Sequence, residues 1–85
     1  MKPAPTPTWT PAPPPTATLN ASSYYNKGEE YHNAENWVMA IREFTRAIYV
    51  NPNYPNAYFY RGSSYAARGQ HSTAIADYNQ AFKLD

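Results

Sequence analysis

The stretch from residue 20 to residue 85 repeats itself at an offset of 34 residues, and this periodicity limits the fold more than any other feature. Six residue pairs are identical at this offset: Tyr24/Tyr58, Gly28/Gly62, Tyr31/Tyr65, Ala40/Ala74, Ile41/Ile75 and Ala47/Ala81. In each copy a tyrosine, a glycine and a second tyrosine stand at i, i+4 and i+7, the spacing of one helical face. An alanine, an aromatic residue and an alanine follow at the same spacing. Each copy is therefore predicted to be a pair of amphipathic helices.

Turn-forming residues set the expected helix boundaries. We predict helices at residues 21–34, 37–50, 55–68 and 71–84. Asn20 is a candidate helix N-cap, and the Asn-Pro-Asn-Tyr-Pro run at 51–55 ends one helix and presets φ for the next. The predicted fold class is all-α: four antiparallel helices, in one repeat at 20–54 and a second at 55–85 that stops before its closing proline.

The glycine inside the first helix of each copy predicts a close helix–helix approach. A glycine in a helix interior costs roughly 1 kcal/mol relative to alanine, so its recurrence indicates a steric requirement. We expect Gly28 to lie opposite Ala40 and Ala47, with the rings of Tyr24 and Phe44 in the flanking grooves.

The first nineteen residues differ in composition from the rest of the chain. Seven of the nine prolines lie between Pro3 and Pro15, among threonines and alanines. Proline fixes φ and lacks an N–H group, so we expect an extended polyproline II or disordered linker. Pro11 and Pro14 have the PxxP spacing, and Trp9 is a candidate to fold back onto the helices or to enter a neighbour's groove.

Charge and hydropathy exclude some classes of partner. The formal net charge is +1, which gives no electrostatic reason to expect binding to nucleic acid or to anionic lipid. No apolar run approaches the roughly 20 residues that span a bilayer, so membrane insertion is not expected. Arg42, Glu43 and Arg46 are interpreted as a solvated outer face. The lack of cysteine leaves the cellular compartment open.

The residues give no basis for catalysis. No nucleophile–base pair, glycine-rich phosphate loop or paired-histidine motif is present in the sequence. The two histidines stand at different repeat positions, and we interpret the possible acid–base or metal-binding side chains as solvated surface residues: His32, His71, Glu29, Glu30 and Glu35. We therefore expect a protein without enzymatic activity, cofactor or metal.

The repeated pattern resembles the tetratricopeptide repeat, a helix–turn–helix unit of 34 residues. The signature positions, in order, are occupied by Tyr24/Tyr58, Gly28/Gly62, Tyr31/Tyr65, Ala40/Ala74, Phe44/Tyr78 and Ala47/Ala81, with a closing proline at Pro52. Lys27 and Arg61 stand where the family usually has leucine. The resemblance covers residues 21–85 and implies helix pairs stacked as a short right-handed superhelix.

The resemblance also implies a function, the binding of a protein partner's peptide segment on the concave face formed by the first helix of each repeat. By helical phase the groove residues would be Ser22, Tyr25, Asn26, Glu29, His32, Asn33, Asn56, Phe59, Tyr60, Ser63 and Ala67. The family's clamp for a C-terminal carboxylate needs lysine, asparagine and arginine in the groove. Only Asn26 matches it, so this clamp is excluded.

The tyrosines of the repeat helices have two possible roles. Tyr24 and Tyr58 are assigned to the core. Tyr25 and Tyr60 fall off the core stripe, and together with Phe59 they either pack between repeats or contact a ligand. A polyproline or aromatic-containing extended peptide would suit such a groove.

An alternative function is structural self-assembly. Only about 65 residues are foldable, and repeat proteins usually need about three units or a cap. No third repeat follows Asp85 in this sequence, so we expect the outer face of the last helix to stay apolar and to mediate homo-oligomerisation, by end-to-end stacking or hairpin exchange. The residues expected there are Tyr78, Ala81 and Phe82.

Overall fold

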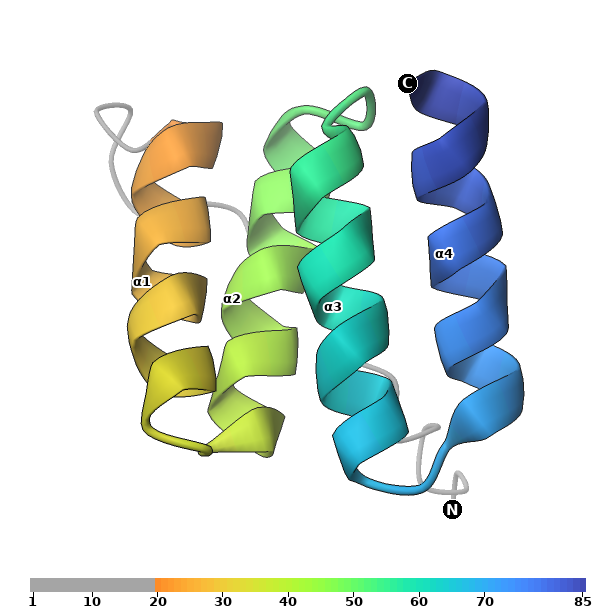
Figure 1. Cartoon of the computed structure of the whole chain (residues 1–85). Helices are drawn as coiled ribbons and strands as arrows, with labels where there is room; N and C mark the ends of the chain where they lie inside the picture. Colours follow the sequence, from red (N-terminus) through yellow and green to blue (C-terminus); the bar gives the residue numbers. More distant parts are fainter. Residues whose placement is uncertain (1–19) are drawn as a thin grey trace, which may run out of the picture.

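The computed structural model describes residues 20–85, and this part of the chain consists of four α-helices and no strand (Figure 1). The helices are α1 (Ala21–Asn33), α2 (Trp37–Val50), α3 (Pro55–Ala67) and α4 (His71–Leu84). The all-α prediction is confirmed, and each helix ends within one residue of its predicted boundary. The expectations about the proline-rich linker, the PxxP spacing and Trp9 lie outside the described residues.

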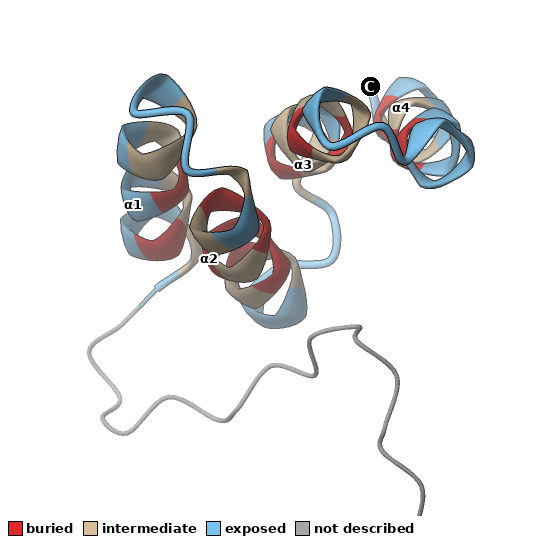
Figure 2. Ribbon diagram, turned by 90° about the horizontal axis from the view of Figure 1, so that it is seen from below, coloured by how far each residue is buried: buried red, intermediate tan, exposed pale blue. Residues whose placement is uncertain are grey.

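The helices pack as two hairpins laid side by side. The first hairpin is α1 with α2 and the second is α3 with α4, while α2 and, more narrowly, α1 contact α3 (Figure 1). Figure 2 shows the buried residues along the sides where the helices meet, and exposed residues on the outward side of α4. We call 20–54 the first repeat and 55–85 the second, a division that stays a prediction.

Local hydrogen bonds and backbone geometry explain where the helices begin. The Asn20 side chain accepts a hydrogen bond from the backbone N–H of Ser23 at 2.9 Å, which confirms it as an N-cap. Asn36 caps α2 in the same way through the N–H of Met39 at 3.4 Å. Pro55 opens α3, where its fixed φ fits the first helical turn.

The turns inside the two hairpins contain a left-handed residue at the same repeat position. Gly69 has φ of 81°, and Glu35, which precedes it by one repeat, has φ of 61°. Glycine adopts this conformation freely, whereas a residue with a side chain pays roughly 1–2 kcal/mol. The conserved backbone geometry in both turns shows that the repeat shape, and not the residue type, dictates the turn.

Gly28 confirms the predicted close approach, but the residue that approaches it is different. A Cβ atom at Gly28 would lie 2.6 Å from Cε1 of Phe44, whose side chain is fully buried. The Phe44 ring therefore lies directly over the glycine, and the prediction that it fills a flanking groove is wrong. An aromatic ring needs more room than an alanine, so the missing Cβ accommodates the largest fully buried side chain of the hairpin.

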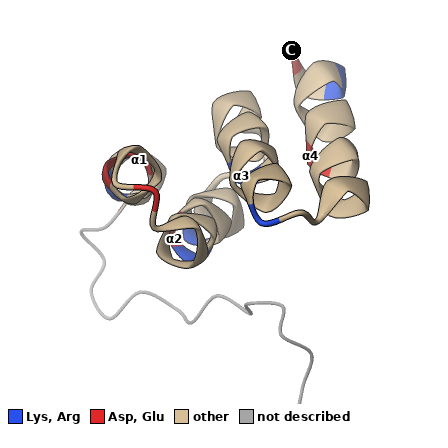
Figure 3. Cartoon of the chain, turned by 60° about the horizontal axis from the view of Figure 1, so that its bottom comes forward, with Lys and Arg blue, Asp and Glu red and all other residues tan. Residues whose placement is uncertain are grey.

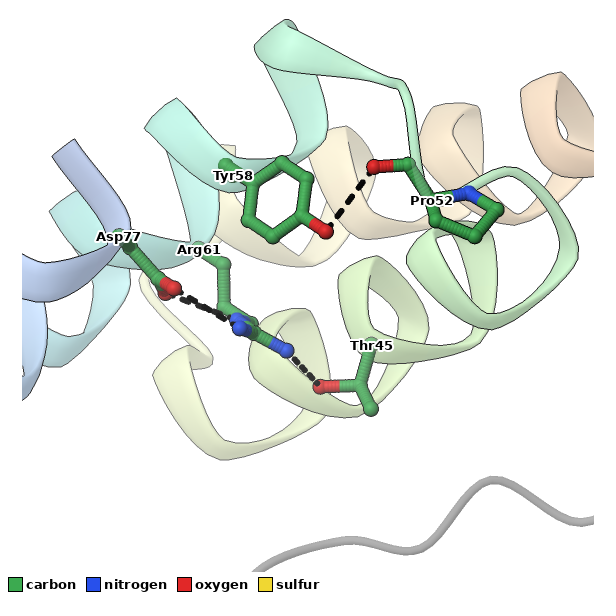
Figure 4. A network of polar contacts seen from close by, with 5 residues as sticks. All are labelled: Thr45, Pro52, Tyr58, Arg61 and Asp77. Carbon is green, nitrogen blue, oxygen red and sulfur yellow. Dashed lines mark hydrogen bonds and ion pairs between the residues drawn. The ribbon is translucent and has the colours of Figure 1, made fainter. Parts of the chain in front are cut away.

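A buried ion pair replaces the leucine that the family pattern would place in the second repeat. The Arg61 guanidinium donates to both carboxylate oxygens of Asp77 at 2.8 Å, and to Thr45 Oγ1 at 3.2 Å (Figure 4). Arg61 therefore links α3 to α4 and to α2. Burial alone lowers the pKa of Arg61, but the hydrogen bonds and negative charge of Asp77 outweigh it and raise the pKa. Lys27, at the same position of the first repeat, is exposed.

Two further assignments from the sequence need correction. Tyr58 is half-buried and not a core residue, because its hydroxyl reaches the carbonyl of Pro52 at 3.0 Å and holds the ring against the inter-repeat loop (Figure 4). The outer face expected around Glu43 is not solvated, since Glu43 is buried and pairs with Arg46 at 3.6 Å. Glu43 precedes Asp77 by one repeat, and both carboxylates occupy a buried position of the second helix.

The contact between Gly28 and Phe44 predicts that Gly28→Ala destabilises the domain. The substitution gains about 1 kcal/mol of helix propensity, but overpacking a rigid core site costs about 1–3 kcal/mol. Since the Phe44 ring cannot move into solvent, we expect a net loss of about 1–2 kcal/mol, measured by urea unfolding followed by circular dichroism. Asn26→Ala, an exposed site on the same helix, is the control and should be neutral or stabilising.

A second substitution identifies the cause. Phe44→Leu in the Gly28→Ala background should cost less than it does alone, because the smaller side chain removes the clash. Unchanged or increased stability of the Gly28→Ala variant would contradict the steric role of the glycine.

Candidate peptide-binding face

The ring of Tyr60 is the centre of an aromatic cluster that connects α1 and α3, and we call the surface formed by Tyr25, His32, Phe59 and Tyr60 the valley. Its centroid lies 6.0 Å from that of Tyr25, 5.4 Å from that of His32, 5.2 Å from that of Phe59 and 6.1 Å from that of Phe44. These residues come from three helices. Tyr60 therefore joins the first helix of one repeat to the first helix of the next.

Tyr25 and Tyr60 are both half-buried. Tyr25 packs against the core formed by Tyr24, Ala47 and Ala57, so the interpretation that it falls off the core stripe is wrong. Tyr54, from the loop before α3, stacks obliquely on Tyr25 at 5.1 Å and so closes one end of the valley. Each ring packs between the helices while part of it stays open to solvent, and contact with a ligand stays a prediction.

Polar side chains extend the valley beyond the rings. Nε2 of His32 lies 3.2 Å from Oγ of Ser63, a contact between α1 and α3, and the His32 ring also meets Trp37 edge-on. Glu29 is half-buried one turn after Tyr25. Burial, and next the charge of Glu29, raise the pKa of Tyr25 well above its ordinary value and also raise the pKa of Tyr54.

The other predicted groove residues lie at the periphery of this cluster. Ser22 is exposed and donates to the capping oxygen of Asn20 at 3.0 Å. The remaining four are exposed along or at the ends of α1 and α3: Asn26, Asn33, Asn56 and Ala67. Figure 3 shows that charged side chains are sparse over the helices, and the predicted groove list contains no lysine or arginine.

A second concave surface lies between α3 and α4. It is a hollow of about 420 Å³ lined by Pro55, Asn56, Phe59, Tyr78, Ala81, Phe82 and Asp85. The hollow brings Asn56 and Phe59 from the predicted groove together with all three residues predicted for self-association. The rings of Phe59 and Tyr78 lie 5.5 Å apart across it.

The three self-association candidates differ in exposure. Phe82 is 84% exposed, Tyr78 is half-buried and Ala81 is buried. Ala81 is little exposed but lines the hollow together with Tyr78 and Phe82, and its part in self-association stays a prediction. Phe82 alone protrudes.

The first repeat shows what a covered copy of this hollow looks like. The residues one repeat earlier are Ala21, Ser22, Tyr25, Phe44, Ala47, Ile48 and Asn51. There, Ala57 of the second repeat is buried in one cluster with Ala47, and Tyr25, Ile48 and Tyr54 pack against this cluster. The hollow is therefore the counterpart of an inter-repeat contact surface. Sequence reasoning missed Pro55 and Asp85 as lining residues, although the 34-residue offset links both to first-repeat positions beside this contact.

The described part of the chain was searched for metal-binding clusters and for membrane-spanning helices. Residues 20–85 contain no cluster of three or more potential metal ligands. Among the four helices described, none is long and apolar enough to cross a bilayer. His71 is exposed at the start of α4, whereas His32 is held between α1 and α3.

Comparison with known proteins places this helix arrangement in a family. Two tetratricopeptide repeat models match the chain, one at residues 21–54 and one at residues 43–76. The first match covers the α1–α2 hairpin, and the second runs through α2 and α3 into α4. The chain belongs to the tetratricopeptide repeat family.

Individual relatives agree with this assignment. Small glutamine-rich tetratricopeptide repeat-containing protein 2 of Mycosarcoma maydis is 36% identical over 59 residues, which is 69% of this chain and 17% of that protein. The DnaJ homolog subfamily C member 7 homolog of Dictyostelium discoideum is 29% identical over 68 residues, 80% of this chain and 13% of that protein. Tetratricopeptide repeat protein 16 of Mus musculus is 26% identical over 70 residues, 82% of this chain and 9% of that protein. The chain thus spans less than a fifth of the length of each of these relatives.

Proposed function

We propose that this chain is a non-enzymatic interaction module that binds an extended peptide segment of a partner protein along the valley between α1 and α3. The observation that carries the proposal is the partly open aromatic cluster around Tyr60, which joins two parallel first helices. Tyrosine and phenylalanine supply large contact areas at low entropic cost, and such residues dominate binding energy at protein interfaces.

The chemistry of the valley favours an extended peptide. Ser63 and His32 offer hydrogen-bonding groups next to the rings, and the amides of Asn26 and Asn56 are exposed nearby. An extended chain exposes its backbone N–H and C=O groups, which amide and hydroxyl side chains can satisfy while proline or aromatic side chains meet the rings. Membership of the tetratricopeptide repeat family supports a protein partner.

The valley predicts a specific effect of steric blocking. A ligand is first selected from a displayed library of random peptides. Asn26→Trp should then weaken its binding by about tenfold or more, since a large ring would fill the open side of the valley. Val38→Trp, at an exposed position of α2, is the matched control and should leave the affinity unchanged. Affinities are measured by fluorescence polarisation, and binding is mapped by amide chemical shifts.

The amide chemical-shift map shows which surface of the protein binds the peptide. Shifts concentrated on α1 and α3 together with the loss in Asn26→Trp support the valley. Shifts confined to α2, or equal losses in the Asn26→Trp and Val38→Trp variants, would refute it.

The hollow favours self-association as a second function. Phe82 protrudes beside a recess of about 420 Å³, so each copy presents both a ring and a cavity on one face. Such a face is complementary to itself across a two-fold axis, which is the commonest symmetry of protein dimers. Stacking of α1 onto the hollow of another copy is disfavoured, because the α1 residues in the positions of Ala57 and Arg61 are the exposed Ser23 and Lys27.

The two-fold arrangement predicts a concentration-dependent dimer that depends on Phe82. Phe82→Lys should make the chain monomeric in sedimentation equilibrium, because two buried ammonium groups would oppose pairing. Ile75→Lys, on the same helix and 57% exposed, is the control and should still dimerise. A wild-type chain that is monomeric at all concentrations, or an equal effect of both substitutions, would contradict pairing through the hollow.

A further inference from the structure

Glu29 is a half-buried acidic residue on the α1 side of the proposed peptide-binding valley. It lies on α1 between Tyr25 and His32, with the i, i+4, i+7 spacing of one helical face. Across the valley, Tyr60 touches both of these rings, at 6.0 and 5.4 Å between centroids. The carboxylate of Glu29 therefore stands on the stretch of α1 that Tyr60 faces.

Glu29 also has no cationic partner among residues 20–85. The ion pairs found there join Arg61 to Asp77 and Arg46 to Glu43. Lys27 is exposed and outside the predicted groove face of α1. Burial first, and the charge of Glu29 second, raise the pKa of Tyr25 and of Tyr54. The negative charge of Glu29 is thus balanced neither by lysine nor by arginine in the described part of the chain.

We propose that Glu29, together with the rings of Tyr25 and Tyr60, forms a subsite for a lysine or arginine side chain of the partner's peptide. The inference rests on the proposed function, because the subsite lies inside the valley. The carboxylate pairs with the cationic head, while the rings contact the aliphatic stem and attract the cation through their π faces. An ion pair next to rings is stronger than one in open solvent.

Glu29 is the one acidic residue among the predicted groove residues. The other predicted groove residues are neutral amide, hydroxyl, imidazole, aromatic or alanine side chains. These groups can hold a peptide backbone but do not distinguish the sign of a side-chain charge. Discrimination between basic and acidic peptides therefore depends on Glu29, and a peptide carboxylate at this place is repelled. This is the opposite preference to that of a carboxylate clamp.

The test uses short acetylated and amidated peptides of alanine and proline that differ at one central position. That position is lysine, arginine, norleucine or glutamate, where norleucine keeps the aliphatic stem without the charge. The lysine and arginine peptides should bind about tenfold more tightly than the norleucine peptide, and the glutamate peptide should bind most weakly. Affinity is measured by fluorescence polarisation at low ionic strength, where the preference is largest.

Two isosteric substitutions make the test specific. Glu29→Gln should abolish the preference for lysine over norleucine. Glu30→Gln removes the same charge from an exposed neighbouring position and should keep the full preference. If both variants lower the preference for lysine equally, the preference arises from the net charge of the chain, and the proposed subsite is wrong.

The remaining outcomes separate this inference from the proposed function. If all four peptides bind equally and shift amides of α1 and α3, the valley binds peptides but the cationic subsite is wrong. If none binds, both proposals fail. Lys2 is the single cationic side chain of residues 1–19. If Lys2→Gln strengthens binding of the lysine peptide, the chain's own tail occupies the subsite, and the assignment to a partner protein is overturned.

Discussion

The guanidinium of Arg61 fixes the position of the second repeat. Within residues 20–85 it is the group whose side-chain hydrogen bonds reach both α2 and α4 from α3, with two bonds to Asp77 and one to Thr45 (Figure 4). A buried ion pair adds little net stability over a well-packed apolar pair, but losing one partner is costly because the other charge stays buried. The pair therefore acts chiefly on geometry. The hydrogen bond from Arg61 to Thr45 carries this constraint from α3 to α2 of the first hairpin, and Tyr60 stands on the same helix, α3.

Two surfaces follow from that geometry. The valley between α1 and α3 joins the repeats, and the hollow between α3 and α4 repeats the same contact surface one repeat later. Phe59 belongs to the rim of both, since its ring touches Tyr60 on one side and Tyr78 on the other. A molecule bound at either surface would therefore contact the same exposed ring. Peptide binding and self-association need not be independent.

The sequence predicts the helices well because its signals are local and periodic. The 34-residue offset, the Asn20 cap and the Pro55 helix start each act over a few residues, and the structure agrees with them. Contacts between side chains on different helices cannot be predicted from these local signals. Arg61 and Lys27 share a repeat position, yet only Arg61 has an acidic partner within reach of its long planar group. Periodicity alone could not distinguish the two.

The candidate site was predicted in outline and not in its contacts. Helical phase gave the residues of the α1 face, but it could not show that Tyr25 packs against the core or that Glu43 is buried. The burial of both residues depends on how the helices are rotated against one another. That rotation is set by contacts between side chains that are far apart in the sequence. The same limit applies to the hollow, whose lining residues come from both helices of the second hairpin and meet only after folding.

A double-mutant cycle at Arg61 and Asp77, measured by urea unfolding, tests the central role of the ion pair most directly. Arg61→Leu and Asp77→Ala are compared singly and together, with Lys27→Leu as the control at the equivalent exposed position. We expect Asp77→Ala to lower the free energy of unfolding by about 3 kcal/mol or more, and the coupling energy of the two residues to exceed about 1.5 kcal/mol. The double variant should then be more stable than the Asp77→Ala variant, because no charge is left buried alone. A coupling energy near zero, with the two single losses simply adding, would contradict the claim that this ion pair holds α3 against α4.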